Sequence, residues 1–407
     1  MSDRFTGRHV VSPDVVCNFK RTDIPTLQRT HRNRIDRCTA STDDRNWVFL
    51  KNILYFATFS AFKRLIPAYK DTMEYIHAIR PWSWTMSALS VMVATAACGQ
   101  HFFASENFVR VLLMGICMQA GGNCTNTYFD YHRGVDTKNS GEKTLVDGVI
   151  PPKHMLFMSN LFYVLSAVAA WPFLQPTSEC SDSDLCYYVR ILFGVGISLA
   201  YAYTASPFSL KYRALGGLAL FVCFGPLLMQ LTSLILLGNV HHVFYIYSVP
   251  VGSLVWATYL ANDARDINSD EQAGVTTLPI WMGYQNAGGL FRFLVITAFV
   301  ATFTLGTFFH WGCFLGFLVT PDVQNLMLLS MRGKDAEIPA LTHKVMVKLS
   351  TLLVVGILIS PNENFPMLTQ RYKLDKAAEV FLNSLPPPVL NFLNKWGTIG
   401  LGYFGIH

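Results

Sequence analysis

Carboxylate and amide side chains end an apolar run in the stretch "GGNCTNTYFDYHRGVD" (121–136). Asn126 and Asp130 are four residues apart, a spacing that places both side chains on one face of a helix. Asp136 follows in the loop after Gly134. Because a charged side chain within a bilayer costs a few kcal/mol, carboxylates at this place indicate a functional site.

A second stretch, "NDARDINSD" (262–270), has the same spacing. Asn262, Asp266 and Asp270 recur every four residues and are expected on one helical face. Both stretches are followed by a Thr-Leu pair and then a Gly, in "KTLVDG" and "TTLPIWMG". These parallels predict a duplicated unit, in which the acidic faces of two helices meet in one cavity.

Converging carboxylates repel one another unless positive charge lies between them. Protons supply that charge in transporter relays, but Mg²⁺ suits the pattern better, because it commonly bridges one or two carboxylates to substrate phosphates. The same loops also carry the basic residues Arg133, Lys138, Lys143, Lys211, Arg213 and Arg265. Acids and bases together predict a site for an Mg²⁺–diphosphate complex at the membrane boundary, with an attached hydrocarbon tail inside the bilayer.

The rest of the chain predicts the helices that would position this site. Of the 407 residues, 51% are hydrophobic and 14% are charged, whereas an average soluble domain has about 25% charged residues. About nine apolar runs reach the roughly 20 residues that cross a hydrocarbon core. They cover 83–104, 107–129, 154–175, 188–206, 215–237, 243–261, 287–309, 311–331 and 344–361. We therefore predict an all-α, polytopic membrane protein.

The basic residues of the short loops predict the orientation in the membrane. Lys and Arg follow the second, fourth, sixth and eighth runs, and the loops between, near 105, 176–187, 238–242 and 310, contain none. Nine spans then place the N-terminus and both acidic stretches on the cytosolic side. The absence of a clear transit peptide favours the endoplasmic reticulum or Golgi membrane over a mitochondrial membrane.

Four segments are expected along the chain. Residues 1–46 are polar and predict a disordered cytosolic tail, and residues 47–72 predict an amphipathic segment in the membrane interface. The membrane domain covers 73–361, and the structure of the tail 362–407 is not predicted.

The cysteines are consistent with a membrane protein that has one oxidising side. Cys180 and Cys186 share a short loop on the predicted lumenal side, where a disulfide can form. No Cys/His cluster predicts a metal site of the zinc type.

The two acidic stretches resemble the aspartate-rich signatures of the UbiA superfamily of intramembrane prenyltransferases, in the branch that acts on naphthoquinones. The first signature there reads Asn-x-x-x-Asp-x-x-x-Gly-x-Asp, and the second Asn-Asn-x-Arg-Asp-x-x-x-Asp-x-x-Ala-Gly-x-x-Thr-Leu. The resemblance also includes "AIRPWSW" (78–84) and "YTASPFSLKYRALGGLALFVCFGPL" (203–227), and it covers about residues 73 to 361. Two positions depart from it, since Asp263 replaces an Asn and Gly217 replaces the usual Asp or Glu.

The resemblance implies a nine-helix bundle around a central cavity that opens sideways to the membrane. It implies that Mg²⁺ and the donor diphosphate are bound by Asp130, Asp136, Asp266 and Asp270, assisted by Asn126 and Asn262. Basic side chains would neutralise the leaving diphosphate, and those expected to contact a substrate are Lys138, Lys143, Lys211, Arg213, Arg265 and Arg80. Aromatic faces would stabilise the allylic cation, with Tyr128, Tyr201 and Tyr203 as candidates.

The implied reaction transfers a geranylgeranyl-type chain from its diphosphate to menadiol, forming menaquinone-4. One acceptor hydroxyl must lose its proton, and Asp263, Asp266 or a bound water is the expected base, with Asp130 as the third catalytic carboxylate. Alternative acceptors are 1,4-dihydroxy-2-naphthoate and 4-hydroxybenzoate, although the abbreviated first signature argues against the latter. The alternatives to an enzyme are a transporter and a non-catalytic membrane scaffold that senses isoprenoids. The expected partners are the two substrates and the lipid bilayer, with no nucleic acid.

Overall fold

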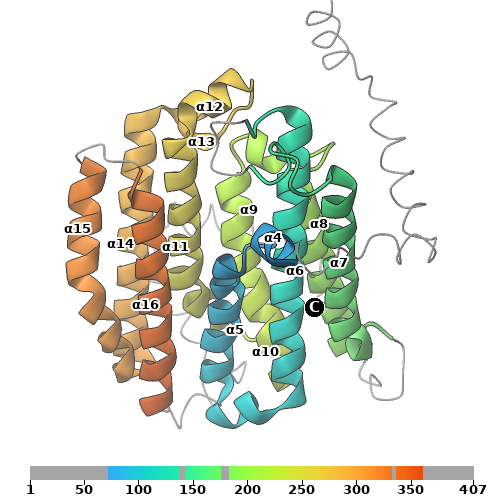
Figure 1. Ribbon diagram of the computed structural model, residues 1–407. Helices are drawn as coiled ribbons and strands as arrows, with labels where there is room; N and C mark the ends of the chain where they lie inside the picture. Colours follow the sequence, from blue (N-terminus) through green and yellow to red (C-terminus); the bar gives the residue numbers. More distant parts are fainter. Residues whose placement is uncertain (1–71, 138–142, 176–182, 332–335, 361–407) are drawn as a thin grey trace, which may run out of the picture. The chain divides into compact units, whose positions relative to one another are not determined.

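The structure is a computed structural model that describes residues 72–137, 143–175, 183–331 and 336–360 (Figure 1). The predicted tails 1–46 and 362–407 lie outside the described residues, as does nearly all of the predicted interfacial segment 47–72.

The described residues form helices, and no strand occurs among them apart from one isolated bridge. The α-helices are α4 (Thr72–Ala78), α5 (Thr85–Cys98), α6 (Glu106–Arg133), α7 (Pro152–Leu174), α8 (Ser183–Ala202), α9 (Gly216–Val222), α10 (Leu228–Leu237), α11 (Phe244–Arg265), α12 (Ile267–Gln272), α13 (Leu278–Met282), α14 (Tyr284–Phe308), α15 (Thr320–Met331) and α16 (Ile338–Ile359). Short 3₁₀ or π segments lie between them: η2 (Pro81–Trp84), η3 (Gln100–Ala104), η5 (Leu210–Tyr212), η6 (Cys223–Leu227) and η7 (Trp311–Val319).

Seven membrane-length segments in the described part of the chain are long and apolar enough to cross a bilayer, and they match the third to the ninth predicted runs. The first run corresponds to α5, which has 14 residues, fewer than the roughly 20 that a span needs. The second corresponds to α6, which has 28 residues but buries the polar side chains of Gln119, Asn123 and Asp130. The all-α membrane fold is confirmed, whereas the count of nine spans is not.

The helices pack in neighbouring groups within the described residues. α6 packs along α7, α11 packs along α14 and α16, and α5 contacts both α10 and α16. In Figure 1, α6, α7 and α8 lie on one side and α14, α15 and α16 on the other, with α12 and α13 at one end of the bundle. Val251, Leu254 and Val255 of α11 are fully buried, so α11 is a central helix of the fold.

The loop before α8 bears on the predicted disulfide. Cys186 is disulfide-bonded in the structure. Its predicted partner, Cys180, lies outside the described residues, so this pairing stays a prediction.

Gly312 of η7 and Gly356 of α16 let two backbones touch. A Cβ atom added to Gly312 would lie 2.1 Å from the carbonyl oxygen of Gly356, and one added to Gly356 would lie 2.2 Å from that of Gly312. The amide of Gly312 also donates to Ser360 Oγ at 3.0 Å. Small residues serve this purpose in membrane proteins because close approach increases van der Waals packing between helices.

We expect Gly312→Ala to lower the thermal unfolding midpoint in detergent, because overpacking a tight contact costs about 1–3 kcal/mol. The matched control is Gly289→Ala in α14, where an added Cβ meets no atom within 4 Å. Equal midpoints for the two variants would show that the backbone contact is not tight.

Candidate active site

Asp130 lies at the centre of a buried polar cluster at the end of α6. Its side chain is only 5% exposed. Asn126 Nδ2 donates to Asp130 Oδ2 at 2.8 Å, and Lys211 Nζ donates to the same oxygen at 2.9 Å. The hydroxyl of Tyr212 donates to Oδ1. A buried carboxylate needs such partners, because an uncompensated charge in a low-dielectric interior is strongly unfavourable.

The chain brings Lys211 and Tyr212 to Asp130 through backbone contacts. Gly134 caps the C-terminal end of α6 in a left-handed conformation, with a φ of 75°. The amide of Lys211 donates to the carbonyl of Tyr203 at 2.8 Å, which folds the short η5 segment back onto the end of α8. The amide of Ala214 donates to the carbonyl of Thr276 at 3.0 Å, beside a parallel bridge between Arg213 and Thr276. The loops after α8 and α12 are therefore joined.

A small apolar cluster covers this junction. Val135, Tyr212 and Val275 pack together, one from each of the loops after α6, α8 and α12. The predicted meeting of the two acidic stretches is consistent with this arrangement, because Val135 follows the first stretch and Val275 follows the second.

Lys211 carries the positive charge that several carboxylates share. Burial would lower the pKa of Lys211, but the carboxylates of Asp130, Asp263 and Asp270 outweigh it and raise that pKa above its ordinary value. Asp270 is 4% exposed. Burial raises the pKa of Asp270 to about 6, while Lys211 opposes the shift and the charges of Asp266 and Asp130 add to it.

Asp266 lies between α11 and α12 and pairs with its neighbour Arg265. α11 ends at Arg265, and Asp266, with φ −96° and ψ 8°, is the single residue between α11 and α12. Arg265 Nε and Nη2 donate to the Asp266 carboxylate at 2.9 and 2.7 Å, in a half-exposed pair. The i→i−4 backbone bonds continue through this position, because the Asp266 amide donates to the Asn262 carbonyl and the Asp270 amide to the Asp266 carbonyl, both at 3.0 Å. The shared face of Asn262, Asp266 and Asp270 stays a prediction.

Two more of the predicted site residues are Asn262 of the second acidic stretch and Tyr203 at the end of α8. Asn262 Nδ2 donates to the carbonyl of Thr258 in its own helix at 3.2 Å. The ring of Tyr203 lies 6.4 Å from that of Tyr259, edge to face. Burial, then the charge of Asp263, raises the pKa of Tyr203 well above its ordinary value, so its hydroxyl stays protonated near that carboxylate.

Besides Lys211, the predicted basic residues Arg80 and Arg133 contact the cluster or the helices that hold it. Arg80 Nη2 donates to Thr127 Oγ1 at 3.0 Å, on the helix that carries Asp130. The guanidinium of Arg133 lies 4.5 Å from the centre of the Tyr212 ring, and its Nη2 donates to Ser209 Oγ at 2.6 Å. A cation over an aromatic face is favourable, the more so when water is excluded.

Four predicted ligands remain: Arg213, Lys143, Asp136 and Lys138. Arg213 is exposed and donates to the carbonyl of Pro207 at 3.0 Å. Lys143 is exposed and Asp136 is half-buried. Lys138 lies outside the described residues.

Three aromatic residues of this region were not among the predicted binding residues. Tyr212 donates to Asp130, Tyr259 contacts Tyr203, and Trp256 packs in α11 one turn before Tyr259. The signal for Tyr212 was its position directly after Lys211. Tyr259 and Trp256 could have been found from their spacing of four and seven residues before Asp263, which places them on or near its helical face.

The donor set fits a hard cation such as Mg²⁺. Asn126 Oδ1 is buried beside Asp130, and no hydrogen-bond partner for it is found in the described part of the chain. The available donors are carboxylate and amide oxygens, which Mg²⁺ prefers. Within the described ranges no three His, Cys, Asp or Glu side chains are grouped closely enough to hold a metal by themselves. Substrate phosphate and water oxygens would therefore have to complete the coordination, as is usual for Mg²⁺.

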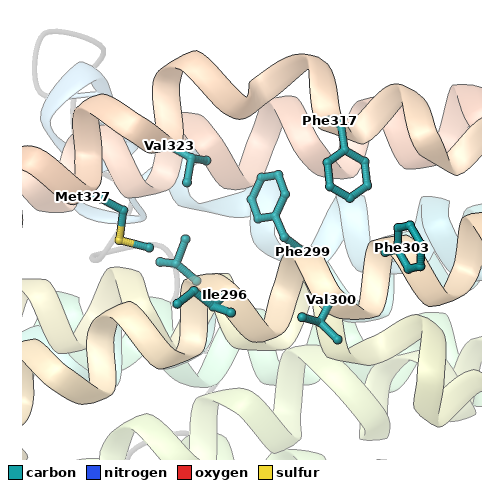
Figure 2. Close-up of a pocket in the computed structure, with 8 residues that line it drawn as sticks. Ile296, Phe299, Val300, Phe303, Phe317, Val323 and Met327 are labelled. Carbon is teal, nitrogen blue, oxygen red and sulfur yellow. The ribbon is translucent and has the colours of Figure 1, made fainter.

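A separate pocket of about 340 Å³ lies between α14 and the η7–α15 segment (Figure 2). Its lining is entirely apolar: Val295, Ile296, Phe299, Val300, Phe303, Phe317, Val323 and Met327. None of the predicted site residues lines it. It offers no group that could hold a diphosphate, so it is not the candidate active site.

Comparison with known proteins agrees with the two signatures. UbiA prenyltransferase domain-containing protein 1 of Danio rerio is 29% identical over 300 residues, which cover 72% of this chain and 86% of the relative. The protein of the same name from Dictyostelium discoideum is 28% identical over 299 residues, covering 72% and 90%. A solved UbiA homologue from Archaeoglobus fulgidus bound to DMAPP and Mg²⁺ is 16% identical, with a TM-score of 0.49, covering 70% of this chain and 98% of that chain.

The match that decides the family spans most of the membrane domain. A model of the UbiA prenyltransferase family matches residues 87–340, more than half of the chain, and this range contains both acidic stretches and the loop of Lys211. The chain belongs to the UbiA prenyltransferase family, whose members are enzymes that transfer prenyl groups.

Proposed function

We propose that this enzyme transfers a geranylgeranyl-type chain from its diphosphate to menadiol in an Mg²⁺-dependent reaction, forming menaquinol-4, which molecular oxygen then oxidises to menaquinone-4. The observation that carries the proposal is the buried cluster in which Lys211 and Tyr212 donate to Asp130. The charges of Asp263 and Asp270 also act on Lys211. Such a concentration of carboxylates around one ammonium group suits a ligand that is itself a metal–phosphate ion pair.

In this reaction the bond between the allylic carbon and the diphosphate oxygen breaks, and its electron pair leaves with the diphosphate. A ring carbon of the acceptor forms the new bond, and the proton on that carbon moves to the oxygen that was deprotonated, so that one proton in all is released. We propose that Mg²⁺ would be held against the diphosphate by Asp130, Asp270 and Asn126. Asp136 and Asp266, which belong to the same two acidic stretches, are further proposed ligands. Mg²⁺ would supply charge neutralisation of the leaving group.

The protein's own side chains have three proposed roles around the reacting atoms. Lys211 turns from Asp130 toward the leaving diphosphate, whose growing charge it stabilises. Tyr203 and Tyr259, whose rings are 6.4 Å apart, present aromatic faces to the allylic cation. Asp263 accepts the proton of the acceptor hydroxyl beside the reacting carbon, which raises the nucleophilicity of that carbon.

The setting of the site supports a lipid-soluble pair of substrates. The residues of the cluster lie at or near the ends of α6, α8 and α11, of which α8 and α11 are membrane-length helices. A charged diphosphate at such an end can stay in the interface while its chain enters the bilayer. We propose that this end faces the cytosol and that the protein resides in the endoplasmic reticulum or Golgi membrane.

The test uses the full-length protein in nanodiscs with Mg²⁺, geranylgeranyl diphosphate and menadiol, and detects menaquinone-4 by mass spectrometry. We expect product that disappears with EDTA and returns when excess Mg²⁺ is added. 1,4-Dihydroxy-2-naphthoate and 4-hydroxybenzoate serve as competing acceptors. If the enzyme turns over either of these faster than menadiol, that compound replaces menadiol as the proposed acceptor. No product from any acceptor, with the protein folded, would favour the isoprenoid-sensing scaffold.

A further inference from the structure

The indole N–H of Trp256 is buried, and within the described part of the chain no acceptor faces it. Its Nε1 atom is inaccessible to solvent. The indole lies against Gly217 of α9, where an added Cβ atom would be 2.0 Å from Nε1. Its ring centre is 6.1 Å from that of Phe221. A buried N–H group that lacks an acceptor costs free energy, so a ligand that supplied an acceptor to Trp256 would gain a hydrogen bond at little desolvation cost.

Trp256 belongs to the same region as the candidate active site. It precedes Asp263 by seven residues in α11, two helical turns that bring both side chains to one face. Gly216, next to Gly217, lies against the site as well. A Cβ atom added there would be 3.0 Å from Lys211 Cα and 3.2 Å from a ring carbon of Tyr203.

The depth of Trp256 selects between the two substrates. Seven helical residues rise about 10 Å, so Trp256 lies about that far along the helix axis from Asp263, toward the middle of the span. At that depth the prenyl donor consists of hydrocarbon and has no hydrogen-bond acceptor. The aromatic acceptor is the only substrate with an oxygen to offer there.

We propose that Trp256 binds the aromatic acceptor, its indole N–H donating a hydrogen bond to the ring oxygen that is remote from the reacting carbon. The inference rests on the proposed function and deepens it. Asp263 receives the proton of the hydroxyl beside the reacting carbon, and Trp256 holds the hydroxyl across the ring. Acceptors with two oxygens placed as in a 1,4-naphthalenediol satisfy both groups. Gly217 is required because any side chain there would displace the indole.

The first test compares Trp256→Phe with the wild-type enzyme. Phe keeps an aromatic ring against Gly217 but lacks the N–H group. We expect the KM for menadiol to rise about tenfold, the loss that one hydrogen bond accounts for, while the KM for geranylgeranyl diphosphate stays within about twofold. Trp281→Phe is the matched control, because Trp281 is 71% exposed, and its constants should equal those of the wild type.

The second test removes the oxygen instead of the donor. 3-Methyl-1-naphthol keeps the hydroxyl beside the reacting carbon and lacks the one across the ring. Its inhibition constant against menadiol should be the same for the wild type and for Trp256→Phe. The inference would be overturned if Trp256→Phe shifted the KM values for menadiol and geranylgeranyl diphosphate equally, or shifted neither. A weaker inhibition constant of 3-methyl-1-naphthol for Trp256→Phe would also overturn it.

A pair of variants separates a folding defect from a binding defect. Gly217→Ala should reproduce the menadiol defect of Trp256→Phe, because its Cβ displaces the indole. In a Trp256→Ala background, Gly217→Ala should add nothing, since residues in contact have non-additive effects. Additive losses would contradict the inference. Failure of the wild-type enzyme to prenylate any acceptor would reject the proposed function instead, so the two failures are distinguishable.

Discussion

Asp130→Asn should lower the rate of prenyl transfer by about a thousandfold, the scale of losing one preorganised electrostatic group in an active site. Asn keeps the shape of the side chain but removes the charge that attracts Lys211 and a divalent cation. The loss should appear in kcat, measured as menaquinone-4 formed under saturating substrates. The purified variant should keep its helical circular dichroism.

The fold should survive this change because Lys211 has other counter-charges. Breaking a buried ion pair costs about 3–5 kcal/mol when the remaining charge is uncompensated, but Asp263 and Asp270 also act on Lys211. Asp322→Asn is the matched control, since Asp322 pairs with Lys348 at 2.5 Å on the partly exposed face of α15. A rate for Asp130→Asn within threefold of the control would remove Asp130 from the catalytic site.

Lys211→Met should raise the KM for the prenyl diphosphate by about a hundredfold. The variant leaves the buried carboxylates without their shared ammonium group and removes one cation from the diphosphate site, and hydrogen bonds to charged groups contribute about 1.5–3 kcal/mol each. Direct donor binding, measured by isothermal titration calorimetry at fixed Mg²⁺, should weaken in parallel.

Lys211→Arg should recover only part of the affinity. Its planar fork delivers hydrogen bonds in another geometry than an ammonium group, and the Lys211 side chain is only 15% exposed. Lys348→Met supplies the control, because this lysine forms a half-exposed pair elsewhere. Donor binding by Lys211→Met that matches Lys348→Met would mean that Lys211 only balances charge in the empty protein.

The fold was largely predictable because its determinants are local. Runs of apolar residues predict membrane helices, since backbone groups in lipid must pair within their own segment. The third to ninth runs became membrane-length helices. The shortness of α5 could not be read from composition, because Gly99 leaves the helix at φ 138° and a 3₁₀ segment follows.

The site was predictable where a continuous helix sets the spacing. Asn126 and Asp130 were predicted to lie on one face of a helix, and in α6 the Asn126 amide donates to the Asp130 carboxylate. The end of α11 at Arg265 was not predictable from this spacing, because the turn at Asp266 keeps the same i→i−4 backbone bonds as the helix before it. Tyr212 was missed for another reason: its place depends on an irregular turn with Ser209 at φ 48°, and irregular turns have no simple periodicity.

The backbone bond from Ala214 to Thr276 has an evolutionary consequence. It joins the loops after α8 and α12 without using any side chain. The backbone bond itself does not depend on which side chains the two loops carry outside the cluster of Val135, Tyr212 and Val275, but proline at position 214 would remove it, since proline lacks the amide hydrogen. Preferences for another aromatic acceptor or prenyl donor can therefore arise by single substitutions on these loops, because the backbone bond that joins the loops is kept.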